Sequence, residues 1–213
     1  MPVRQAFGSP GGKSHLAPRI VKLIPKHNTY VEPFAGGAAV FYHKEPSSRE
    51  VLNDKDTEIA FAHRFIKSMT NAEFKALKRM QWTPYKGTFE RVKHTKPKGR
   101  VERFRRFYYL SGASWGGGKE QFGHEGGSKI DIDKLVRCKA RLKGVTILNK
   151  DYKSVISSYN SSSTFFYIDP PYPGTSFLGK EDNFTERHLQ ELIAQLKKIK
   201  GKFILSLSSK RSF

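Results

Sequence analysis

One stretch of this chain constrains its fold more than any other, namely residues 164–172, which read TFFYIDPPY. The first five residues are β-branched or aromatic and follow a serine-rich turn, a pattern typical of a buried parallel strand. Asp169, Pro170, Pro171 and Tyr172 come next, and because proline cannot extend a hydrogen-bonded ladder, the backbone leaves the sheet there. In open α/β sheets, ligands bind at that carboxyl edge. The stretch therefore predicts an α/β fold with a binding site at residues 169–172.

The groups after this strand suit an exocyclic amino group such as N6 of adenine. An oxygen of Asp169 and the carbonyl of Pro170, which the fixed φ of proline holds in place, provide two acceptors close together. If both hydrogens of the amino group are held, its nitrogen lone pair is freed to attack an electrophilic methyl group, and Tyr172 can stack on the base. Taken alone, the same four residues are equally compatible with a proline-rich turn capped by an aspartate.

Two glycine-rich loops and an acidic strand end precede this stretch. The first loop spans residues 7–14 (FGSPGGKS), and the second, residues 35–39 (AGGAA), follows a strand predicted over residues 29–34. Backbone N–H groups in such loops can approach a ligand closely because no side chains intervene. The second loop is not the dinucleotide fingerprint GxGxxG, so hydride chemistry is not indicated. A strand over residues 50–54 ends in Asp54, where a carboxylate can accept both hydroxyls of a ribose.

The other segments continue an alternation of strands and helices. Further strands are predicted over residues 145–149 and 202–207, and helices over residues 14–23, 38–44, 57–69, 71–80 and 131–142 and after Thr185. Among the apolar residues expected to be buried are Leu16, Ile20, Leu23 and Ile24 in the first helix and Leu135, Val136 and Cys138 in the fifth. The alternation predicts a three-layer α/β sandwich with a mainly parallel sheet.

Residues 82–128 interrupt this alternation. Residues 86–106 carry nine lysines and arginines, with aromatic residues among them, and a glycine-rich sequence follows. A basic helix that leads into such a loop suits contacts with phosphates. We expect Phe104, Phe107 and Tyr108 to pack on the core and the charges to face DNA.

The charge of the whole chain also indicates a polyanionic partner. Its 39 lysines and arginines outnumber 19 acidic residues, giving a formal charge of +20, which attracts phosphates. A very soluble surface is the alternative interpretation. Cys138 is the sole cysteine, so neither a disulfide framework nor a thiol metal site is expected. Without a signal peptide or a long apolar run, we expect a cytoplasmic protein with no membrane partner. We also expect the protein to be monomeric and to bind no metal.

Taken in order, the motifs resemble those of the Dam-like family of DNA adenine-N6 methyltransferases, which use S-adenosylmethionine. They cover nearly the whole chain and are PGGK (10–13), EPFAGG (32–37), LND (52–54), the pair Asp151-Tyr152, DPPY (169–172) and ILSLS (204–208). DPPY alone is shared with other amino-group methyltransferases, whereas the ordered set is far more specific.

The resemblance implies a Rossmann-like methyltransferase fold that methylates N6 of a flipped adenine at specific sites in double-stranded DNA. Residues 1–81 and 129–213 would form the catalytic domain that binds S-adenosylmethionine, and residues 82–128 an inserted, mostly helical target-recognition lobe. The implied catalytic residues are Asp169, Pro170, Pro171 and Tyr172. The implied cofactor-binding residues are Gly11, Gly12 and Lys13 for the methionine part, Glu32, Phe34, Ala35 and Gly36 for the central portion, Asp54 for the ribose, Asp151 and Tyr152 for the adenine, and Asp169.

Two features depart from the family pattern. Ser9 stands where the family usually has an aromatic residue before its glycine–lysine loop, and Phe7 is the nearest ring. The family also continues beyond the ILSLS strand, whereas this sequence ends at Phe213, so either the chain is truncated or the sheet closes without the further strands. An exposed edge on the last strand would then lower solubility. The alternatives are a methyltransferase acting on RNA adenine, cytosine N4 or a protein glutamine, and an inactive, truncated DNA-binding relative. The motifs leave open the recognised sequence, for which GATC is common in the family, and a restriction partner.

Overall fold

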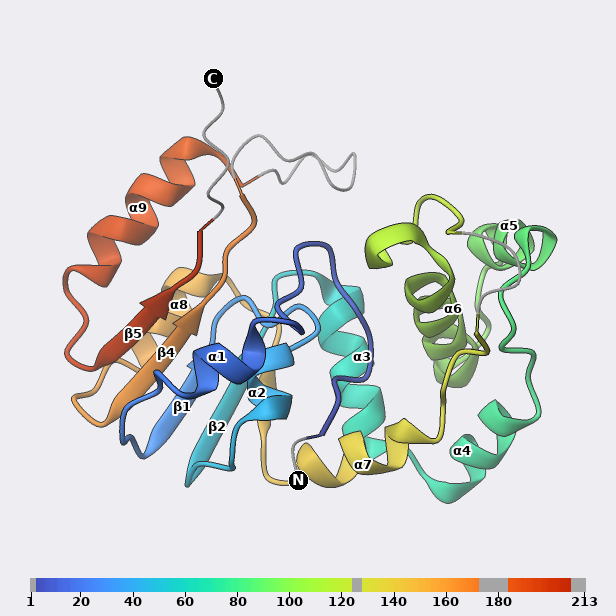
Figure 1. Ribbon diagram of the computed structural model, residues 1–213, viewed down its shortest axis with the longest axis horizontal. Coiled ribbons are helices and arrows are strands. Elements are labelled where there is room, and N and C mark those ends of the chain that lie inside the picture. Colours follow the sequence, from blue (N-terminus) through green and yellow to red (C-terminus); the bar gives the residue numbers. More distant parts are fainter. Residues whose placement is uncertain (1–2, 124–127, 173–183, 208–213) are drawn as a thin grey trace.

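A single parallel sheet organises the protein (Figure 1), and the computed structural model describes residues 3–123, 128–172 and 184–207. The five strands of the described sheet lie in the order β3-β2-β1-β4-β5. They are β1 (Thr29–Glu32), β2 (Arg49–Asn53), β3 (Thr146–Leu148), β4 (Thr164–Ile168) and β5 (Lys202–Leu205). In the central register, Val31 of β1 pairs with Val51 on one side and Phe166 on the other. The strand order reverses between β1 and β4, so the topological switch point lies at their carboxyl ends.

Alternate residues of the strands face two separate cores. Tyr30, Leu52 and Phe165 belong to one cluster, which packs against α1 (Ala17–Val21), α2 (Ala39–His43), α3 (Thr57–Ser68) and α7 (Lys134–Arg141). Val31 and Phe166 belong to the other, which packs against α8 (Tyr152–Ser158) and α9 (Glu186–Leu196). Successive side chains of a strand point to opposite faces, so both faces are covered by helices. The predicted three-layer sandwich with a parallel sheet is confirmed.

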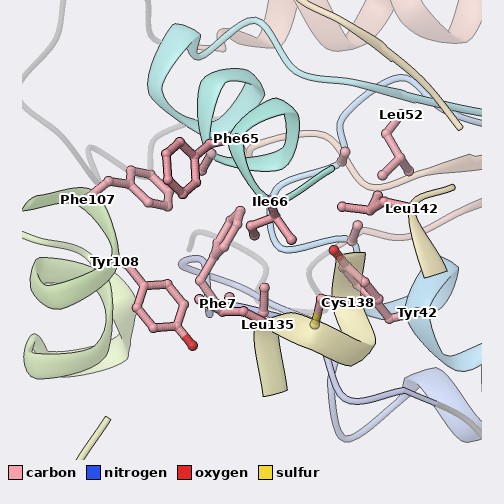
Figure 2. Close-up of a cluster of buried hydrophobic side chains, with 14 of the residues drawn as sticks. Phe7, Tyr42, Leu52, Phe65, Ile66, Phe107, Tyr108, Leu135, Cys138 and Leu142 are labelled. Atoms are coloured by element: carbon pink, nitrogen blue, oxygen red, sulfur yellow. The ribbon is translucent and has the colours of Figure 1, made fainter. Parts of the chain in front are cut away.

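The remaining helices lie to one side of the sheet in Figure 1 and are α4 (Asn71–Lys78), α5 (Lys86–His94), α6 (Arg100–Ala113) and the single 3₁₀ turn η1 (Trp115–Gly117). Helix α6 packs into the same hydrophobic cluster as Tyr30, Leu52 and Phe165 of the sheet. The Phe104 ring stacks on Phe65 of α3 with centroids 4.3 Å apart. Figure 2 shows Phe107 and Tyr108 of α6 in the same cluster as Phe65 and Leu135. The prediction that the α6 aromatics pack on the core is confirmed.

Two arginines of α6 form ion pairs with neighbouring helices at the protein surface. Arg103 binds Glu58 of α3 with a nitrogen–oxygen distance of 2.6 Å, and Arg100 binds Glu73 of α4 at 2.9 Å. Arg103 also lies over the Phe61 ring. Acidic residues on neighbouring helices therefore pair with Arg100 and Arg103, while the expectation that the charges of this segment face DNA stays a prediction.

The first helix is shorter than predicted, and its expected apolar face is not wholly buried. α1 starts at Ala17, with Pro18 in its first turn, and ends at Val21. Proline suits the start of a helix because its missing N–H would have no partner there. Leu16 and Leu23 therefore lie outside the helix and are 46% and 69% exposed.

Capping side chains mark the starts of helices α3 and α9. The side chain of Asp56 accepts from the N–H of Glu58 at the start of α3, and Thr185 caps α9 as predicted. Asp131 accepts from two N–H groups just before α7, but Val136 on that helix is 52% exposed rather than packed. The reason is that α7 buries only the stripe that carries Leu135 and Cys138.

No helix in the described part of the chain is long and apolar enough to cross a membrane. Residues 124–127 of the predicted recognition lobe, and Ser208 at the end of the ILSLS motif, lie outside the described residues.

Candidate active site

A cavity of about 890 Å³ opens at the carboxyl ends of β1 and β4. Its volume falls within the range of roughly 300–1,000 Å³ found for small-molecule sites. The structure brings together all the site residues that the sequence predicted, which line this cavity: Gly11, Gly12, Lys13, Glu32, Phe34, Ala35, Gly36, Asp54, Asp151, Tyr152, Asp169, Pro170, Pro171 and Tyr172. The cavity therefore lies at the topological switch point, where open α/β sheets bind ligands.

An ion pair occupies the centre of this cavity wall. Both oxygens of Asp169 accept from Nζ of Lys13, at 2.7 and 2.9 Å, and the same ammonium group donates to the carbonyl of Gly11 at 2.7 Å. The two side chains are 12% (Lys13) and 19% (Asp169) exposed. Burial raises the pKa of Asp169, and the hydrogen bond from Lys13 opposes that rise without cancelling it. Burial by itself lowers the pKa of Lys13, but its bond to Asp169 leaves that pKa raised.

Tyr172 completes this side of the cavity. Nζ of Lys13 lies 5.2 Å from the centroid of the Tyr172 ring, a cation–π distance. Gly11 has a φ of +70°, and a Cβ atom added there would lie 4.0 Å from the ring. The first glycine loop and the aromatic ring that follows β4 are thus in contact range across the cavity.

The second glycine loop is held from two sides. Gly36 has a φ of +49°, and its N–H donates to Asp54 at 2.8 Å while its carbonyl accepts from Nε2 of His63 at 2.8 Å. Asp54 also accepts from the N–H of Asp56 at 2.9 Å. Burial raises the pKa of Asp54 to about 6, although these two N–H groups lower it. Ala38 has a φ of 54°, a left-handed conformation that costs a non-glycine residue energy and recurs at functional sites.

Glu32 ends β1 and is buried in the cavity wall. Its Oε1 accepts from the Tyr30 hydroxyl at 2.6 Å and from the N–H of Phe41 at 2.8 Å, which ties the strand to α2. Burial raises the pKa of Glu32 to about 8, although both hydrogen bonds lower it. At neutral pH this carboxyl group is therefore mostly protonated.

The far side of the cavity is formed after β3. Asp151 caps α8 by accepting from the N–H of Lys153 at 2.8 Å, and its side chain is exposed. Tyr152 lies beside Phe34 with ring centroids 4.9 Å apart, and its hydroxyl donates to the carbonyl of His188 at 3.3 Å. An acid and two aromatic rings therefore flank the end of the cavity away from Asp169.

Three polar residues that the sequence did not assign to the site hold its walls. Asn53 donates to the carbonyls of Pro33 and Lys150 at 2.8 and 3.0 Å, which joins the ends of β1, β2 and β3. Ser9 accepts from a backbone N–H of the second glycine loop at 3.1 Å, and His63 binds that loop as described above. Asn53 lies within the LND motif and Ser9 at the departure from the family pattern. His63 has no local signal because it reaches the loop from α3.

The chemistry of these groups fits a nucleoside cofactor that carries hydroxyl and amino donors. Carboxylates stand at the ends of neighbouring strands, glycines leave the loops open, and aromatic rings line one end. Among residues 3–123, 128–172 and 184–207 no group of three or more His, Cys, Asp or Glu side chains could hold a metal ion. A parallel α/β sheet with this site at its switch point is consistent with a Rossmann-like methyltransferase fold. The sequence profile of the D12 class N6 adenine-specific DNA methyltransferases matches residues 9–213. The chain belongs to that family, which implies S-adenosylmethionine as the methyl donor and DNA as the substrate.

Three Type II methyltransferases are similar to this chain. M.CviBI of Paramecium bursaria Chlorella virus NC1A is 29% identical over 191 residues, covering 81% of this chain and 73% of the relative. M1.LlaDCHI of Lactococcus lactis subsp. cremoris is 28% identical over 181 residues, covering 76% and 63%. M.MjaIII of Methanocaldococcus jannaschii is 27% identical over 207 residues, covering 82% and 70%.

Proposed function

We propose that this chain transfers a methyl group from S-adenosylmethionine to N6 of an adenine in double-stranded DNA, and that the cavity holds both the cofactor and the target base. The observation that carries the proposal is the position of Asp169, which follows β4 and shares one cavity with both glycine loops and Asp54. An adenine within a duplex cannot reach this carboxylate. The base is therefore flipped out of the stack, at a cost of about a few kcal/mol.

The target adenine is held by the residues that follow β4. Asp169 and the carbonyl of Pro170 accept the two N–H groups of N6, and Tyr172 stacks on the base. Pro171 restricts the turn between them. Lys13 keeps Asp169 ionised and oriented through its bonds to both carboxylate oxygens. Because the nitrogen needs no metal or general base once it is positioned, orientation supplies most of the rate enhancement.

The cofactor is held by the two glycine loops and the two acids at strand ends. When bound, S-adenosylmethionine supplies a methyl group activated by its sulfonium centre. Each oxygen of Asp54 has one backbone donor, so each retains a lone pair for a ribose hydroxyl. Asp151 accepts from the cofactor's adenine amino group, beside the backbone of Tyr152. The other contacts come from Gly11, Gly12 and Lys13 for the methionine part and from Glu32, Phe34, Ala35 and Gly36 for the central portion.

Residues 82–128 form the DNA-recognition lobe in this proposal. Arg91 of α5 and both Lys96 and Lys98, which follow that helix, are exposed. Phosphate contacts of such side chains make DNA affinity fall steeply with salt. A flat salt profile would contradict the role of this lobe.

The experiment that tests the proposal measures transfer of labelled methyl groups from S-adenosylmethionine to unmethylated duplex DNA, with Asp169→Ala in parallel. We expect incorporation that is lost in the variant, while cofactor affinity stays within a few-fold of the original. Digestion of the product should release N6-methyladenine. Recovery of N4-methylcytosine, or incorporation into RNA alone, would contradict the proposed substrate, and equal loss of transfer and cofactor affinity would contradict the role of Asp169.

A further inference from the structure

A run of lysines joins the end of α9 to the start of β5. Its members are Lys197, Lys198, Lys200 and Lys202. All four residues are exposed, and none of them forms an ion pair with any residue that the structure describes. By contrast, Lys93, Arg100 and Arg103 of the basic segment 86–106 are each paired with a carboxylate. The positive charge after α9 is therefore available to a partner outside the described chain.

The lysine run is held firmly against the turn that precedes β4. The Nδ2 atom of Asn160 donates to the carbonyl of Lys198 at 3.2 Å, and its Oδ1 atom accepts from the N–H of Lys200 at 2.7 Å. A Cβ atom added to Gly201 would lie 2.1 Å from the carbonyl oxygen of Thr164, so the two turns can approach this closely only because residue 201 is glycine. The lysines therefore project from a fixed backbone.

The residues around this contact are hydrogen-bond donors and a further cation. Residues 161–163 are three exposed serines. Exposed Arg49, at the start of β2, lies over the ring of Tyr159, with its guanidinium carbon 4.9 Å from the ring centroid. We call residues 161–163, Arg49 and the four lysines the amino-edge surface, because β2, β4 and β5 begin there.

This surface is strongly positive over a considerable width. Neither residues 157–164 nor residues 197–202 include an acid. Glu50, which follows Arg49, is buried and bound to Lys44 and Arg141. In the sheet, β2 and β5 are separated by β1 and β4, so the cations span roughly 14 Å at the usual strand spacing. That width is enough to meet several phosphates of one DNA duplex.

The amino-edge surface lies away from the proposed active site. The strands are parallel, so their amino ends lie at the opposite edge of the sheet from the cavity. Figure 1 also shows the turn between α9 and β5 at the other end of the molecule from α5 and α6. A duplex that enters the cavity and contacts residues 82–128 therefore leaves this surface open to a separate ligand.

We propose that the amino-edge surface binds the phosphates of a second DNA segment while a first segment occupies the cavity. The inference goes beyond the proposed function and uses only the DNA substrate that the family implies. Lysine, arginine and serine side chains bind DNA phosphates without reading the sequence. A protein already bound to DNA meets other segments of the same polymer at high effective concentration, which favours DNA over other polyanions.

The test measures how many short DNA duplexes one chain holds at low salt. Native mass spectrometry of the full chain with excess duplex should show two duplexes per chain. A duplex fixed on beads should likewise retain a second, fluorescent duplex only when the protein is present. One duplex per chain at saturation, or bridging only by complexes of two chains, would overturn the proposal. Binding of duplex RNA or of phosphatidylserine vesicles without a second DNA duplex would assign the surface to another partner and overturn it too.

A charge-removing variant locates the second site. Lys198→Gln/Lys200→Gln removes two cations and keeps the backbone bonds to Asn160. We expect the affinity for the second duplex to fall about tenfold, and its dependence on salt to weaken by about 1.8 in the slope of log affinity against log salt. The matched control is Lys75→Gln/Arg79→Gln, which removes two exposed charges of α4 and the residue after it. Equal weakening by both double variants would show that net charge alone matters, and would overturn the proposal.

Methyl transfer distinguishes this inference from the proposed function. Transfer to a single short duplex, and the thermal midpoint, should be the same in Lys198→Gln/Lys200→Gln as in the original protein. Normal transfer by a protein that never holds a second duplex would overturn the amino-edge surface and leave the proposed function standing. Two bound duplexes without any methyl transfer would contradict the proposed function and leave the amino-edge surface in place.

Discussion

Two ion clusters lie at opposite ends of the same sheet and have different environments. At the amino end, Glu50 of β2 binds Lys44 at 2.7 Å and is also bound by the guanidinium group of Arg141, and all three side chains are buried. At the carboxyl end, Asp169 binds Lys13. At the amino end the three donors of the Lys44 ammonium group are all used, since it also donates to the carbonyl of Glu45 and the hydroxyl of Ser47.

The pKa values show what this difference means. Burial raises the pKa of Glu50, but hydrogen bonds from Arg141 and Lys44 outweigh it, so the net pKa is lowered. The pKa of Asp169 stays raised because burial outweighs the bonds from Lys13 and Tyr172. A carboxylate with two cationic partners serves the fold, whereas one with a single cation beside a cavity keeps acceptor capacity for a ligand. We therefore infer a structural role for the cluster at the amino end of the sheet and, in line with the proposed function, a role in ligand binding for the pair at the carboxyl end.

The largest expected effect is a difference in methyl-transfer activity between variants of the two carboxylates, Asp169 and Glu50. Asp169→Asn keeps the shape of the side chain but replaces one acceptor oxygen with a donor, so we expect methyl transfer to fall by about 10³-fold with little change in the unfolding midpoint. Glu50→Gln, assayed per folded molecule under the same conditions, should retain turnover. A Glu50→Gln enzyme that is folded but as inactive as Asp169→Asn would contradict the division of roles.

The same two substitutions should affect stability in the opposite order, with Glu50→Gln more destabilising than Asp169→Asn. Glu50→Gln leaves two buried cations without their carboxylate and should lower the free energy of unfolding by about 3 kcal/mol in urea titrations. Because the native pKa of Glu50 is lowered, its contribution is present above the ordinary pKa of 4.5 and is lost as pH falls through the native value. The stability difference between the two proteins should therefore shrink in acid, and a constant difference down to low pH would exclude this linkage.

Lys13→Met tests whether the ion pair at the carboxyl end of the sheet controls the protonation of Asp169. Without the ammonium group, burial raises the pKa of Asp169 further, so the acid limb of the pH–rate profile should move to higher pH. The loss of rate should be smaller than in Asp169→Asn and should diminish as pH rises. An unshifted acid limb would show that this ion pair does not control the protonation of Asp169.

Glu32 provides a further comparison, as a buried carboxyl group that, in the described part of the chain, is hydrogen-bonded to Tyr30 and Phe41 rather than paired with a cation. Its pKa is about 8 in the native protein against an ordinary value of 4.5, so its favourable contribution exists below pH 4.5 and is lost as pH rises to about 8. Glu32→Gln removes this loss while keeping an acceptor for Tyr30 and Phe41. Thermal midpoints should show the variant gaining stability relative to the original protein as pH rises from 4.5 to about 8; a parallel pH dependence would contradict the raised pKa.

Much of the site could be predicted because its signals are local. The strand over residues 164–168, the proline break after it and the acid at the end of β2 depend on neighbouring residues alone, and all lie where they were predicted. The parallel order of the strands then brings their carboxyl ends to one cavity. The partner of Lys13 was not predicted, because the resemblance placed this lysine at the cofactor carboxylate and the structure pairs it with Asp169.

The sequence by itself determined the layered parallel fold, the motif residues at the sheet edge and the basic character of the chain, because strand chemistry, glycine loops and charge act over short stretches. The tertiary structure decided which charges are paired internally, as with Arg100 and Arg103, and that His63 holds the glycine loop. It also decided that Leu23 and Trp115 are exposed while Phe104 is buried. Exposure and ion pairing depend on which elements pack against each other, and those neighbours are distant in the sequence.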